Sequence, residues 1–148
     1  MNPVYKKTAL GIFKRQLKQV LPTYKQIKAG LPGCTVFSSA HSKDLHLYVL
    51  VYWASYDETF NVRIGWNYKS TLDDLSSYYD PSNVIDFNAV IISLNSLSGQ
   101  AEVWHSLRDA RHVILDAEGI ESVIASSIQE LMSIGVPCLE RVVSSKSC

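Results

Sequence analysis

Apolar residues recur at three- and four-residue spacing near the start of the chain, which predicts an amphipathic helix. Asn2 is a suitable N-cap, Pro3 suits the first helical position, and Pro22 should end or kink the helix. Tyr24 and Ile27 are expected to continue a short second helical segment. The apolar positions of the first helix are Ala9, Ile12, Phe13, Leu17, Val20 and Leu21.

A second helical pattern lies near the end of the chain. Asp116 is the expected N-cap, and Gly135 is expected to end the helix in a left-handed conformation just before Pro137. The tail from Val136 should then turn back. The apolar stripe of this helix consists of Ile120, Val123, Ile124, Ile128, Leu131 and Met132.

The middle of the chain has the two-residue periodicity of strands. Leu45–Ala54 is apolar on both faces, which predicts a strand at the centre of its sheet, and Thr59–Asn67 should pair with it as an antiparallel hairpin. Cys34–Ala40 and Ala89–Leu94 are the other expected strands. The pattern of Val103–Leu107 fits either a short strand or a loop.

Strands between terminal helices, without βαβ alternation, favour an α+β fold. We expect an antiparallel sheet of about four strands with the N-terminal and C-terminal helices packed on one face, and a single domain over residues 1–148. A weak capping box also predicts one or two helical turns over Ser70–Tyr79.

The charged residues are distributed unevenly along the chain. Fourteen basic and fourteen acidic residues give a net charge of zero, yet residues 1–43 hold eight Lys and Arg and no acid, so the remainder carries −8. Lys7, Lys14, Arg15 and Lys18 give the first helix a basic face. This face either meets an anionic partner or is balanced by the acidic part of the same chain. Without an aromatic–basic ribonucleoprotein motif, the pattern argues against nucleic acid.

Motifs for catalysis, metal and cofactor binding are missing from the sequence. It has no G-x-G-x-x-G, Walker A, H-E-x-x-H or G-x-S-x-G pattern, and its acidic pairs, Asp57-Glu58 and Asp73-Asp74, fit capping better than catalysis. We therefore expect no cofactor and no metal, and the missing motifs favour a binding protein over an enzyme.

The cysteines and the apolar runs bear on compartment. Cys34, Cys138 and Cys148 are odd in number and lack C-x-x-C spacing, so we expect no disulfide framework, a buried Cys34, an exposed thiol at Cys148 and a cytoplasmic protein. The longest nearly apolar stretch, Leu45–Ala54, is too short to span a bilayer as a helix, so no membrane association is expected.

Two groups of residues are candidates for binding. Arg63 lies between Asn61 and Gly65 on a strand, with Trp66 following, and an arginine beside bare glycine backbone can receive a carboxylate or phosphate. The alternative is an Arg63 paired across the sheet to an acid. Tyr48 and Tyr52, on the face opposite Trp53, together with Tyr56 form either a partner-binding surface or the second covered face of a central strand.

Two segments, Val62–Trp66 and Gly135–Glu140, in the order helix, aromatic hairpin, helix, resemble small bacterial α+β domains of unknown function. Some of those domains are similar to toxin-immunity proteins. The resemblance implies a binding protein rather than an enzyme. An origin in mobile DNA, such as an integron cassette, is a further expectation.

The leading hypothesis is thus a cytoplasmic, non-catalytic interaction protein, immunity-like, whose sheet or basic helix engages another protein. The alternative is a small-molecule-binding protein or weak enzyme with a cleft near Asn61, Arg63 and Trp66. Self-association as a dimer is also expected, because an uncovered sheet edge and a net charge near zero both favour it.

Overall fold

The computed structural model describes residues 1–28, 32–42, 45–68, 90–101 and 104–145, and it confirms the α+β fold. The sheet is antiparallel and has six strands rather than about four, in the order β1-β2-β3-β4-β5, with β6 pairing with β4. Two of the strands are so short that period-two alternation cannot reveal them. The strands are β1 (Lys25–Ile27), β2 (Cys34–Ala40), β3 (Leu45–Trp53), β4 (Thr59–Tyr68), β5 (Val90–Ser93) and β6 (His105–Ser106).

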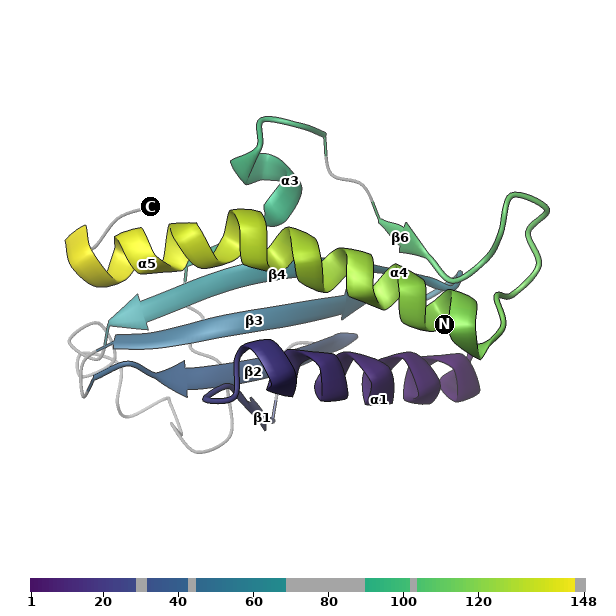
Figure 1. Ribbon diagram of the computed structural model, residues 1–148, viewed down its shortest axis with the longest axis horizontal. Coiled ribbons are helices and arrows are strands. Elements are labelled where there is room, and N and C mark those ends of the chain that lie inside the picture. The colour runs from purple at the N-terminus through teal and green to yellow at the C-terminus, as the bar shows by residue number, and fades with distance from the viewer. Residues whose placement is uncertain (29–31, 43–44, 69–89, 102–103, 146–148) are drawn as a thin grey trace.

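The terminal helices cover one face of this sheet, as expected. Helix α1 (Pro3–Val20) and the long helical run that begins with α4 (Ala117–Glu130) lie side by side on that face (Figure 1). Both N-caps are confirmed, because Asn2 Oδ1 accepts from the backbone of Val4 and Asp116 Oδ1 accepts from that of Gly119.

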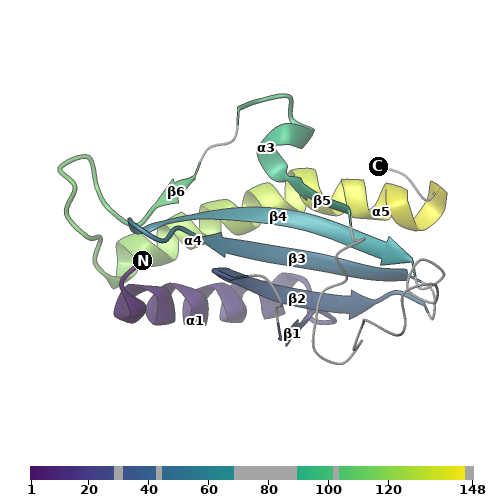
Figure 2. The ribbon, with the colours of Figure 1, turned by 180° about the vertical axis from the view of Figure 1, so that it is seen from behind.

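The central hairpin also has the expected form. β3 lies between β2 and β4, and its register with β4 runs from Leu45 opposite Tyr68 to Trp53 opposite Phe60. Alternate β3 residues meet the helices, and the side chains between them lie on the opposite face of the sheet. Figure 2 shows the ribbon from behind, with the sheet in front of the helices. The buried β3 and β4 residues of the helix-side core are Leu45, Leu47, Val49, Val51, Trp53, Phe60, Val62, Ile64 and Trp66.

The expected helical continuation at Tyr24–Ile27 is wrong. Lys25–Ile27 instead pair with Val36–Ser38 as the edge strand β1. Leu21 caps α1 outside the helical conformation, and the chain reverses through Pro22 and Thr23 to return along β2. Pairing satisfies backbone groups of β2 that a helix would have left unbonded.

The expected chain reversal at Gly135 is also wrong. Leu131–Gly135 form a π-helical turn, η1, and the chain continues without a break into α5 (Val136–Ser145). Gly135 has no positive φ, and a Cβ there would lie 2.9 Å from Leu94 and 3.0 Å from Ile64. This glycine therefore allows the helix to approach the sheet closely. The wider turn also accommodates Pro137, which has no N–H to donate.

The segment after the hairpin is partly described. β5 covers Val90–Ser93 of the expected strand, and Leu94–Leu97 form a short helix, α3, followed by a turn at Gly99 with φ +73. Of the range Val103–Leu107, Val103 lies outside the described residues, and His105–Ser106 form the short strand β6. The helix expected over Ser70–Tyr79 lies outside the described residues, as does Cys148.

Two findings bear on compartment. Cys138 is fully buried and disulfide-bonded, against the expectation from the cysteine count. Disulfides persist mainly in oxidising compartments, and the cytoplasmic location stays a prediction. The helical run Ala117–Ser144, of 28 residues, is long and apolar enough to cross a membrane, but its buried side is part of the core against the sheet, and core helices pass the same test. Polar residues interrupt this run, so it contains no continuous apolar stretch of that length.

Candidate functional site: a basic cleft between α1 and β1

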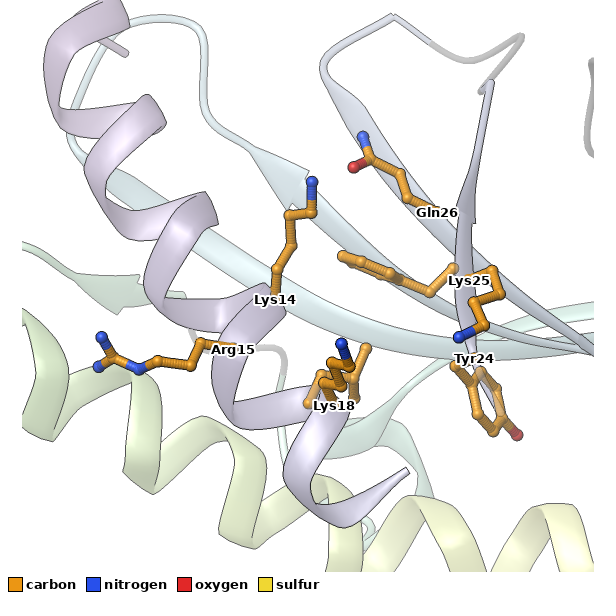
Figure 3. Close-up of a pocket in the computed structure, with 8 residues that line it drawn as sticks. Lys14, Arg15, Lys18, Tyr24, Lys25 and Gln26 are labelled. Carbon is orange, nitrogen blue, oxygen red and sulfur yellow. The ribbon is translucent and has the colours of Figure 1, made fainter. Parts of the chain in front are cut away.

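The strongest candidate site is a cleft of about 440 Å³ between the last turns of α1 and the edge strand β1. Lys14 and Lys18 extend into it from α1 and Lys25 from β1 (Figure 3). These residues alternate with apolar ones because the helix and the strand each bury one face and expose the other. The residues that line this basic cleft are Lys14, Arg15, Leu17, Lys18, Tyr24, Lys25, Gln26 and Phe37.

The charges of the basic cleft differ in how they are balanced. Arg15 points away from the lysines and donates from Nη2 to Glu121 Oε1 of α4 at 2.5 Å (Figure 3). Lys18, in the last turn of α1, also lies where the helix dipole favours a cation. Within the described part of the chain, no carboxylate pairs with Lys14, Lys18 or Lys25. The charge of Arg15 is therefore balanced within the chain, which is one of the two interpretations that the sequence left open.

The floor of the basic cleft is apolar. Leu17 and Phe37 are almost fully buried, and the Phe37 ring packs against Phe13 of α1 with ring centroids 5.8 Å apart. Tyr24 lies at one end, with its hydroxyl pointing away from the lysines (Figure 3). Burial raises the pKa of Tyr24 to about 12, so this side chain is a neutral phenol over the physiological pH range.

Arg63, the first sequence candidate, is on the sheet face opposite the helices. Its guanidinium carbon lies 4.3 Å from the ring centroid of Tyr52, and its Nε donates to Asn61 Oδ1 at 3.0 Å. Stacking and hydrogen bonding therefore hold Arg63 in place. Asn61 is itself buried, with an exposed fraction of 1%.

Trp66 does not join Arg63 in a cleft. Residues 63 and 66 differ by an odd number along β4, so their side chains leave opposite faces of the sheet, and Trp66 is buried under the helices. The glycine backbone at Gly65 is not bare either, because a Cβ there would lie 2.6 Å from the carbonyl oxygen of Val90 in β5. The structure thus keeps Asn61 and Arg63 together and places Trp66 on the other face of the sheet.

The tyrosines of the predicted aromatic surface also separate. Tyr48 is 2% exposed and its hydroxyl donates to Asn67 Oδ1, which makes it part of a covered face. Tyr52 is half-buried under Arg63, whereas Tyr56, in the loop between β3 and β4, is fully exposed. The interpretation as a covered second face therefore holds for Tyr48.

Nucleophilic and metal chemistry find little support among the described residues. Burial raises the pKa of the Cys34 thiol to about 11, against the opposing charge of Arg63, so the thiol is protonated near neutral pH. No group of three or more His, Cys, Asp or Glu side chains within the described ranges could hold a metal ion. Glu58, one of the paired acids, binds Arg108 Nε at 2.7 Å.

Helical periodicity in the sequence predicts the basic face of α1 but not its counterpart across the cleft. Lys25 and Gln26 line the site because they belong to the edge strand β1, and Tyr24 lines it because it directly precedes that strand. The sequence pattern predicts a helix for this segment instead. The isolated Pro22 was the one local signal for this change of direction.

No family model, no curated protein and no solved structure matches the chain.

Proposed function

We propose that the protein is a non-catalytic binding protein whose basic cleft holds an acidic segment of a partner protein. The observation that carries the proposal is the convergence of Lys14, Lys18 and Lys25 from two elements on one apolar-floored cleft. Cations of like sign repel one another, and a bound carboxylate would relieve that repulsion.

The basic cleft differs from common phosphate sites in two features of its lining. Phosphate is commonly bound by helix N-termini or by arginine forks. Here the helix end next to the cleft is the C-terminal end of α1, and the one lining arginine, Arg15, is paired with Glu121. The Arg15–Glu121 pair shows that a cation on this helix can bind a carboxylate, because it joins α1 to a glutamate of α4.

A partner other than a second copy of the chain fits this proposal better. Of the acids in the described residues, several already make contacts within the chain, which leaves fewer of them for the cleft of another copy. These are Glu58 with Arg108, Asp109 and Asp116 with backbone N–H groups, Glu121 with Arg15, and Glu130 with His105. Dimerisation stays a prediction, tested by light scattering across a salt series, in which a charge-driven dimer should dissociate as salt rises.

The toxin-immunity resemblance stays a prediction as well. It would make the partner a toxin domain with an acidic surface segment. A cytoplasmic location is part of that hypothesis and not a requirement of the binding chemistry.

The proposal is tested by titrating the isotope-labelled protein with hexaglutamate and following backbone amide NMR signals. We expect shifts concentrated around Lys14, Lys18 and Lys25, with an affinity that falls as salt rises. The double variant Lys18→Glu/Lys25→Glu should lose these shifts, because it replaces attraction with repulsion. Arg111→Glu, an exposed position in the loop before α4, is the control and should keep them.

Two outcomes would contradict the proposal. One is hexaglutamate binding that the double variant retains in full. The other is a pattern of shifts that avoids the basic cleft.

A further inference from the structure

A second groove lies beside the basic cleft, on the other side of Tyr24. It has a volume of about 380 Å³ and lies between the end of α1, the loop after β2 and α5, over Leu47 of β3. Its lining is mainly apolar and consists of Leu21, Tyr24, His41, Leu47, Val136, Leu139, Glu140 and Val143. We call it the apolar groove.

The basic cleft and the apolar groove are neighbours through shared structure. Tyr24 lines both, and α1 contributes Leu17 to the cleft while its C-cap residue, Leu21, lines the groove. A ligand that crosses Tyr24 therefore passes from a cationic environment directly into an apolar one.

The dimensions of the apolar groove suit side chains. A cavity of about 150 Å³ holds one benzene ring, so a groove of about 380 Å³ has room for one or two large apolar side chains. Glu140 at the groove would repel an anionic group placed there, so the carboxylates of a bound segment belong in the basic cleft and its apolar side chains in the groove.

We propose that the bound partner segment is acidic and apolar in succession, with carboxylates in the basic cleft and one or two large apolar side chains in the apolar groove. This inference rests on the proposed function and specifies its partner. The lysines would attract the segment and set its register. The apolar side chains would supply most of the affinity, because burying one such side chain raises the affinity by about tenfold or more.

The test uses labelled peptides measured by fluorescence anisotropy. One contains six glutamates and three leucines, and its matched control contains six glutamates and three serines, each made in both orders. We expect the leucine peptide, in one of the two orders, to bind at least about tenfold more tightly than the serine peptide.

Variants then place the gain in the apolar groove. Val143→Asp puts a charge at a half-buried groove position, so it should abolish the tighter binding of the leucine peptide relative to the serine peptide. The control Val113→Asp, at an exposed loop position, should affect neither. If Val143→Asp does not fold by circular dichroism, the isosteric Val143→Thr replaces it, with an expected loss of about fivefold for the leucine peptide.

The outcomes separate this inference from the proposed function. If both peptides bind equally through the lysines, the inference fails and the proposed function stands, and if neither peptide binds, both fail. A dimer that Val143→Asp converts to a monomer would overturn the inference by assigning the apolar groove to a second copy. Vesicles of phosphatidylcholine and phosphatidylserine that bind in a Val143-dependent way would overturn it by assigning the groove to a membrane.

Discussion

Replacing Gly135 with alanine tests the close packing of the C-terminal helix on the sheet. The added methyl group would lie 2.9 Å from Leu94 Cδ2, 3.0 Å from Ile64 Cγ2 and 3.0 Å from Leu131 Cδ1. All three neighbours are buried, so they have little room to move away.

The expected magnitude follows from a comparison with Gly11, an exposed glycine in α1 where an added methyl group would have no atom within 4 Å. Alanine gains about 0.5–1 kcal/mol over glycine inside a helix, and both substitutions share this gain. Overpacking costs about 1–3 kcal/mol and applies only at Gly135. Gly11→Ala should therefore be stabilising, and Gly135→Ala should be about 1–3 kcal/mol less stable than Gly11→Ala.

Urea denaturation followed by circular dichroism measures this difference. With a typical dependence on urea, the midpoints of the two variants should differ by on the order of 1 M. Gly135→Asn adds a second comparison, because a left-handed helix end tolerates asparagine, whereas a crowded position should lose more stability with asparagine than with alanine. Equal midpoints for Gly11→Ala and Gly135→Ala, or an asparagine variant more stable than the alanine variant, would refute the packing argument.

Three further substitutions probe other parts of the molecule. Burial lowers the pKa of His105 below its usual 6.5, even though Glu130 opposes the shift. The free energy of unfolding should therefore fall as pH drops through 6.5. His105→Phe should remove this pH dependence, as measured by urea denaturation between about pH 5 and 8. Because the pKa of Tyr24 is about 12, ultraviolet titration should show one phenol that ionises near that pH, and Tyr24→Phe should lack this transition. The contribution of the buried neutral phenol to stability should be lost as pH rises above 10. Thr35→Val removes the hydroxyl that accepts from Trp53 Nε1 at 3.0 Å, and it should cost about 1–3 kcal/mol in thermal or urea unfolding; a change near zero would contradict the importance of that bond.

The sequence by itself determined the elements whose signals are local. Asn2 and Pro3 define the start of α1, Asp116 defines that of α4, and apolar residues on both faces of Leu45–Ala54 predict the central position of β3 in the sheet. Each of these signals depends on residues within one turn or one strand, so no knowledge of distant segments is needed.

The candidate site was predictable only in part. The basic face of α1 follows from helical periodicity, but the sequence could not show that Lys25 lies opposite Lys14 and Lys18. That placement depends on the pairing of Lys25–Ile27 with Val36–Ser38, which involves backbone groups and carries almost no side-chain signature in three residues.

Tertiary packing also decided what the glycines do. Gly135 before Pro137 has the local pattern of a helix end, yet the close approach of Leu94 and Ile64 uses this glycine to continue the helix across the sheet. Gly65 has the pattern of open backbone, yet Val90 of β5 covers it. A glycine permits either a turn or a close contact, and only the neighbours that the fold brings to it determine which one it serves.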